Sequence, residues 1–97
     1  MASIKDLKKD IDLLMSLVLN DCFSVLEHNS KVDNEAIYKI AGDVIQKHRE
    51  LRLRANHPDG KDNPKLVRKY FNTLISDALK EADAALEKLS AEVKKVA

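Results

Sequence analysis

Apolar residues recur every three or four positions along most of this chain, which is the period of one face of an α-helix. The first series predicts a helix over residues 4–28 and consists of Ile4, Leu7, Ile11, Leu14, Val18, Cys22 and Val25. Ser3 stands at the N-cap position and Asp6 three residues later, an acidic version of the capping box. Residues 13–19 are apolar on more than one side, so we expect this helix to pack against two neighbours.

A second series predicts a helix over residues 34–55. The positions on its core-facing arc are Ile37, Ile40, Ala41, Val44, Ile45, His48, Leu51 and Ala55. Asp33 is the expected N-cap, which puts Val32 and Ile37 in the positions of a hydrophobic staple. Pro58 follows shortly after the series and prevents the helix from resuming.

A third helix is predicted from Pro64 almost to the C-terminus, with Asn63 as its N-cap. Its apolar face consists of Val67, Phe71, Leu74, Ala78, Ala82, Ala85, Leu89, Val93 and Val96. At 1.5 Å per residue this helix is about 50 Å long, against roughly 37 Å and 33 Å for the first two. We therefore expect its last turns to extend beyond the other helices and to leave apolar surface, from Leu86 to Val96, for a partner or a second chain.

Three amphipathic helices with short connections predict an all-α, antiparallel up-down-up three-helix bundle with a long C-terminal helix. We expect one domain over residues 1–97. The composition agrees, because 44% of the residues are hydrophobic and 34% charged, with two Gly and two Pro. Such a composition excludes collagen-like and intrinsically disordered chains.

Charge is distributed unevenly along the chain. The 17 Lys and Arg against 16 Asp and Glu give a net charge of +1, yet residues 47–69 carry +5 and the remainder −4. Arginine offers planar donors suited to carboxylate or phosphate. We therefore expect this region to bind a macromolecular partner, through Arg49, Arg52, Arg54, Lys61, Lys65, Arg68 and Lys69.

Three interpretations of this basic region stay open. A protein with an acidic surface is the partner that we expect, although its identity does not follow from the sequence. Nucleic acid is an alternative, with Tyr70 and Phe71 as the aromatic residues interleaved among the basic ones. The third is a solvated surface whose positive charge complements the dipole of the preceding helix.

The tripeptide His57-Pro58-Asp59 lies between the second and third predicted helices. It resembles the signature of the J-domain co-chaperones, which have it in the loop after a basic helix. The resemblance implies that residues 57–59 trigger ATP hydrolysis by a partner chaperone, with the arginines of residues 49–54 corresponding loosely to the basic helix. The first two helices are longer than those of a J-domain, and its Tyr-x-x-Leu-Gly-like opening is absent. A helix stop followed by an Asp-Gly turn explains the same residues.

No motif predicts an enzyme. The chain has no Gly-rich phosphate loop, no Gly-x-Ser-x-Gly and no His-Glu-x-x-His, so we expect neither catalysis nor a cofactor or metal. Cys22 has no second cysteine to pair with and is expected to be a small buried hydrophobe. His48 is expected to be a hydrogen-bonded core residue.

We expect a cytoplasmic protein that does not interact with membranes. The N-terminus lacks the basic-then-apolar order of a secretory signal, and no apolar run exceeds three residues, as at residues 17–19, which excludes a spanning helix. The alanines Ala78, Ala82 and Ala85 would let a helix approach closely, either inside the bundle or at a homodimer interface formed by the third helix. The sequence thus predicts a small, non-enzymatic helical interaction module.

Overall fold

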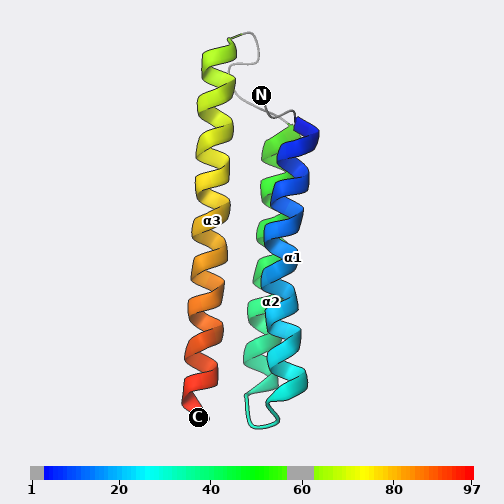
Figure 1. The fold of residues 1–97 in the computed structure, drawn as a ribbon, viewed down its shortest axis with the longest axis vertical. Coiled ribbons are helices and arrows are strands. Elements are labelled where there is room, and N and C mark those ends of the chain that lie inside the picture. Colours follow the sequence, from blue (N-terminus) through cyan, green and yellow to red (C-terminus); the bar gives the residue numbers. More distant parts are fainter. Residues whose placement is uncertain (1–3, 57–62) are drawn as a thin grey trace.

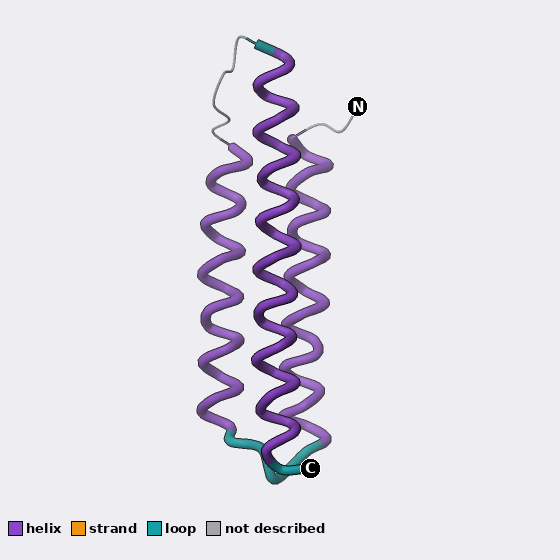
Figure 2. The backbone as a smooth tube through the Cα atoms, turned by 90° about the vertical axis from the view of Figure 1, so that its left-hand side faces the viewer, coloured by secondary structure: helices purple, strands orange, loops and turns teal. Residues whose placement is uncertain are grey.

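The chain forms three helices, α1 (Ile4–His28), α2 (Asn34–Asn56) and α3 (Pro64–Lys95), in a computed structural model that describes residues 4–56 and 63–97. They run up, down and up, so that α1 and α3 are parallel and α2 is antiparallel to both (Figures 1 and 2). The described residues contain no strand. The predicted all-α three-helix bundle with a long C-terminal helix is confirmed, and α3 has 32 residues against 25 and 23 for α1 and α2.

Side-chain caps begin α2 and α3 at the predicted places. The carboxylate of Asp33 accepts hydrogen bonds from the backbone N–H of Glu35 at 3.1 Å and of Ala36 at 3.4 Å. Asn63 accepts in the same way from Lys65 at 3.0 Å and Leu66 at 3.4 Å. These bonds satisfy amide groups that have no partner inside the helix. The predicted cap Ser3 lies outside the described residues.

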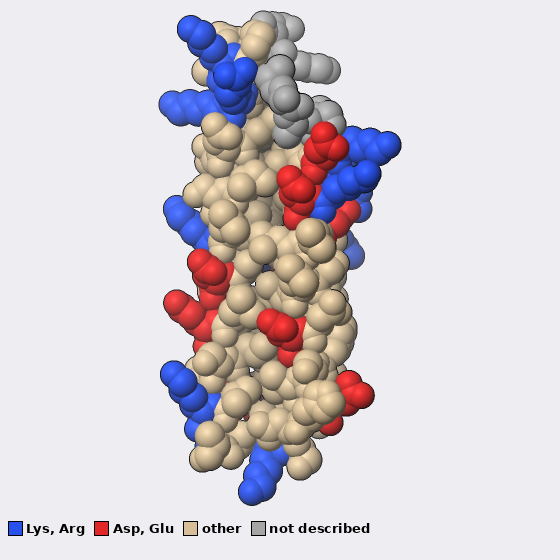
Figure 3. Space-filling model, in the orientation of Figure 1, with Lys and Arg blue, Asp and Glu red and all other residues tan. Residues whose placement is uncertain are grey.

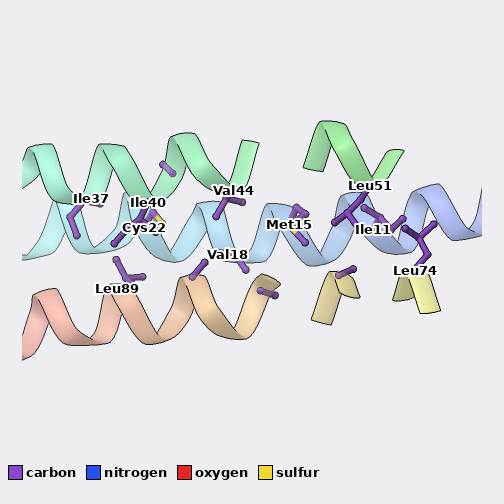
Figure 4. Close-up of a cluster of buried hydrophobic side chains, with 14 of the residues drawn as sticks. Ile11, Met15, Val18, Cys22, Ile37, Ile40, Val44, Leu51, Leu74 and Leu89 are labelled. Carbon is purple, nitrogen blue, oxygen red and sulfur yellow. The ribbon is translucent and has the colours of Figure 1, made fainter. Parts of the chain in front are cut away.

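The core is a continuous apolar seam along the bundle axis, and each helix contacts the other two (Figure 4). The largest fully buried side chains are Ile11, Met15, Val18, Cys22, Ile37 and Leu74. The alanines Ala78, Ala82 and Ala85 are also buried in this seam. Their small side chains therefore serve close packing within one chain.

Two residues of the predicted α2 arc lie outside the core. Ile45 is exposed and His48 is half-buried, whereas the other six members of the arc are buried. Ile45 follows Val44 by a rotation of 100°, which turns it out of the seam. His48 was predicted to be a core residue, and this is wrong, but its predicted hydrogen bond is present, because its Nε2 lies 2.5 Å from Asp12 Oδ1.

The predicted overhang of α3 is at the opposite end from the one expected. The C-terminus lies level with the turn between α1 and α2, and the first turns of α3 extend beyond the other helices (Figures 1 and 2). Leu89 is buried, and Val93 and Val96 pack against the core. The lengths of the helices determine by how much α3 projects. The end of the bundle at which it projects depends on the axial register of α3 against the other helices. Core packing sets that register, with Leu89 near Cys22 at one end of the seam (Figure 4).

Candidate functional site

The six predicted partner-binding residues that the structure describes do not form one patch, and Arg54 is a link between helices. Its Nη2 donates to Asp77 Oδ2 of α3 at 2.8 Å. Its backbone carbonyl accepts a hydrogen bond from the Tyr70 hydroxyl at 3.0 Å. The hydrogen bond to Asp77 raises the pKa of the Arg54 guanidinium, so the charge is permanent. Arg54 therefore ties α2 to α3.

Arg52 turns to the other flank of α2, toward α1. Its Nε lies 3.7 Å from Asp12 Oδ1, the oxygen that also faces His48. Both Arg52 and Asp12 are substantially exposed, so the attraction is weakened by water. Asp12 with His48 and Arg52 forms the polar link between α1 and α2.

The remaining described basic residues of the set are exposed. Lys65, Arg68 and Lys69 lie on the projecting first turns of α3, which we call the basic end. Figure 3 shows Lys and Arg gathered over this end of α3. Arg49 is exposed on α2, and Lys61 lies outside the described residues, as does the tripeptide at residues 57–59.

A groove between α1 and α3 is a surface that the sequence analysis missed. Its upper part, of about 300 Å³, is lined by Asp10, Ile11, Leu13, Leu14, Leu17, Ile75, Ala78 and Leu79. Leu13 is 62% exposed, Leu17 54% and Leu79 50%. The apolar residues on a second side of the first helix were the available signal. As those residues predict, α1 contacts both neighbouring helices, but Leu13 and Leu17 stay more than half exposed.

A second hollow lies between the same two helices, toward their C-terminal ends. This lower part, of about 330 Å³, is lined by Asp21, Ser24, Val25, Leu86, Leu89, Ser90 and Val93. The two parts together run along residues 10–25 of α1 and 75–93 of α3, which we call the α1/α3 groove. Figure 3 shows this face of the molecule, on which most residues are uncharged and the acidic groups are few and separate.

The boundary between α2 and α3 is chemically different. A hollow of about 230 Å³ at this boundary is lined by Asp43, Lys47, Glu81 and Lys88, which carry charges of both signs, together with apolar residues such as Ile40 and Ala85. In the part of the chain that the structure describes, no group of His, Cys, Asp and Glu is arranged to hold a metal ion. Burial raises the pKa of the Cys22 thiol, with a further contribution from the charge of Asp21. The thiol is therefore neutral and unreactive in the fold.

Comparison of this chain with family models, with curated proteins and with solved structures finds no match. None of the helices, over the described residues, is long and apolar enough to cross a membrane.

Proposed function

We propose that this protein is a small, non-enzymatic helical module that docks an acidic protein surface through its basic end. The observation that carries the proposal is the projection of the first turns of α3 beyond the bundle, with Lys65, Arg68 and Lys69 exposed on them. Positive side chains on a projecting helix meet a partner before the rest of the molecule does. They therefore increase the association rate with an acidic surface.

The basic end also carries apolar surface. Leu66 is exposed between Lys65 and the next basic residues. An interface needs an apolar contact at its centre, and a charged rim supplies orientation more than affinity. Leu66 is the side chain that would supply this contact, with Arg49 on α2 as a further cation.

The two aromatic residues beside the basic end favour a protein partner over nucleic acid. The Tyr70 hydroxyl donates to Arg54, and Phe71 packs against the core. Both rings are therefore engaged within the bundle, whereas proteins that bind single strands offer aromatic rings for bases to stack on. We further propose a cytoplasmic location, where a lone thiol such as Cys22 stays reduced.

The test is recovery of partners from host lysate, both untreated and nuclease-treated, with wild-type protein and with a variant in which Arg49, Lys65, Arg68 and Lys69 are all changed to Glu. The control changes four exposed lysines elsewhere, Lys5, Lys31, Lys39 and Lys94, to Glu, and so has the same net charge. We expect proteins that the control recovers and the basic-end variant does not. Equal recovery by both variants would contradict the proposal, and a partner that nuclease removes would make the ligand nucleic acid.

A further inference from the structure

The α1/α3 groove has the dimensions of a binding site for one helix. The two helices that border it run parallel (Figure 1). Residues 10–25 of α1 correspond to about 22 Å of helix, or about four turns. Apolar side chains line its two parts from Ile11 and Ile75 at one end to Val25 and Val93 at the other. An amphipathic helix in a groove buries anchors at such helical spacing, and here it would complete a four-helix bundle.

The charges along the groove indicate what kind of helix it would bind. Asp10 lines the upper part and Asp21 the lower part, and no Lys, Arg or His lines either part among the described residues. Asp83 follows Leu79 by four residues and so lies on the same flank of α3. From these charges we infer that the α1/α3 groove binds an amphipathic helix of another protein whose apolar stripe is flanked by Lys or Arg.

A second copy of this chain fits the groove less well. A two-fold dimer brings the same surface of both subunits together. According to the direction of the two-fold axis, each of Asp10 and Asp21 would approach either its own copy or the other aspartate of the second subunit, and like charges repel at an interface. A helix with basic residues on its flanks would instead form ion pairs with these two carboxylates.

Each of the other two helix boundaries is crossed by a polar link. The link of Asp12 with His48 and Arg52 joins α1 to α2, and the ion pair of Arg54 with Asp77 joins α2 to α3. Within the described chain, no ion pair or hydrogen bond crosses between residues 10–25 and 75–93. A helix can therefore enter the α1/α3 groove without breaking a link. This inference concerns a different surface from the basic end and does not depend on it.

The probe is a synthetic amphipathic peptide of about 18 residues, long enough for four to five helical turns. One version carries Leu at helical spacing with Lys on both flanks, and a second carries the same Leu residues with Glu on the flanks. Binding to the full chain is measured by fluorescence anisotropy. We expect the Lys peptide to bind at least about tenfold more tightly than the Glu peptide.

The variant that tests the groove is Leu17→Gln with Leu79→Gln. Both side chains are half-exposed, so the fold is retained, which circular dichroism verifies. We expect binding of the Lys peptide to weaken by at least about tenfold, because two apolar anchors are lost. Leu53→Gln is the matched control, since Leu53 of α2 is 56% exposed, against 54% for Leu17, and does not line the groove. It should bind as wild type does.

The acidic edge is tested separately with Asp10→Asn and Asp21→Asn together. We expect about tenfold weaker binding of the Lys peptide, since two charge pairs are lost. Glu35→Gln with Glu87→Gln changes the net charge equally at exposed positions that do not line the groove, and should have a smaller effect.

Three outcomes would overturn the inference. They are equal binding of the Lys and Glu peptides, unchanged binding by the Leu17→Gln, Leu79→Gln variant, and a wild-type dimer in sedimentation that this variant disperses. The last would make a second copy the occupant. The basic-end variant should still bind the Lys peptide, so failure of the proposed function and failure of this inference are distinguishable.

Discussion

The two boundaries of α2 and the α1/α3 groove are formed by the same three helices, yet different kinds of side chain lie along their edges. On each flank of α2 a polar group reaches the neighbouring helix, from Arg54 to Asp77 and from His48 to Asp12. At the α1/α3 boundary, leucines such as Leu17 and Leu79 lie at the edge of the groove. A polar link ties a pair of helices together, whereas half-exposed leucines leave a surface that another apolar surface can cover.

The contrast is sharpest within one turn of α1. Ile11 and Met15 are buried, while Leu13, in the same turn, is largely exposed. All three are good helix residues, and only the core requires the first two. Burial in the core therefore does not explain why an apolar residue occupies position 13, whereas the proposed docking surface would.

The largest expected effect separates the core from the groove on α3. We expect Leu74→Ala to destabilise the fold by about 3 kcal/mol, because Leu74 is fully buried and its removal leaves a cavity. Leu79→Ala should destabilise it by less than about 1 kcal/mol, because half of that side chain is already in water. Urea unfolding followed by circular dichroism measures both. Similar values for the two would show that Leu79 is part of the core.

A pH effect of intermediate size comes from the core. The raised pKa of Cys22 means that its thiol stays protonated in the fold at a pH where the unfolded chain ionises. Its contribution to stability is complete below about pH 8.5 and is lost as the pH rises beyond that value, by at most about 1.4 kcal/mol per pH unit. The difference in unfolding free energy between wild type and Cys22→Ala, measured from pH 7 to 10, should shrink accordingly. A constant difference would contradict the buried, neutral thiol.

The link between α2 and α3 is expected to contribute about 1 kcal/mol, since it is a short and partly buried ion pair. A double-mutant cycle with Arg54→Met and Asp77→Asn isolates this coupling from the effect of each change alone. Additive effects of the two changes would mean that the link does not hold the helices together.

The smallest effect is expected at Arg52. Its 3.7 Å distance from Asp12 and its exposure predict that Arg52→Met changes stability by only about 0.3 kcal/mol. The same urea unfolding measures it. A loss as large as that of Arg54→Met would place the stronger link on the α1 flank of α2.

The helices and their caps could be predicted from the sequence because each depends on local chemistry. The period of apolar positions and the caps Asp33 and Asn63 act within a few residues of each helix start. The axial register of α3 could not be predicted, since it depends on which side chains interlock across helices. The length of α3 therefore indicated that it projects beyond the other helices, but not at which end of the bundle.

The candidate sites, too, could be predicted from the sequence only in part. Clustering in the sequence brought Arg49, Arg52 and Arg54 together, but neighbouring residues on a helix point in different directions. Arg52 and Arg54 are two residues and therefore 200° apart, so they face different helices. The excess leucines of α1 were visible in the sequence, but which of them two neighbouring helices would leave exposed depends on the packing of all three.

The most direct test of the α1/α3 groove as a docking surface is a titration of isotope-labelled protein with the Lys-flanked peptide, followed by the backbone amide shifts in NMR spectra. The account predicts that the largest shifts lie in residues 10–25 and 75–93, with α2 and the basic end little changed. Shifts that centre on α2 or on residues 65–69, or no shifts at peptide excess, would contradict it.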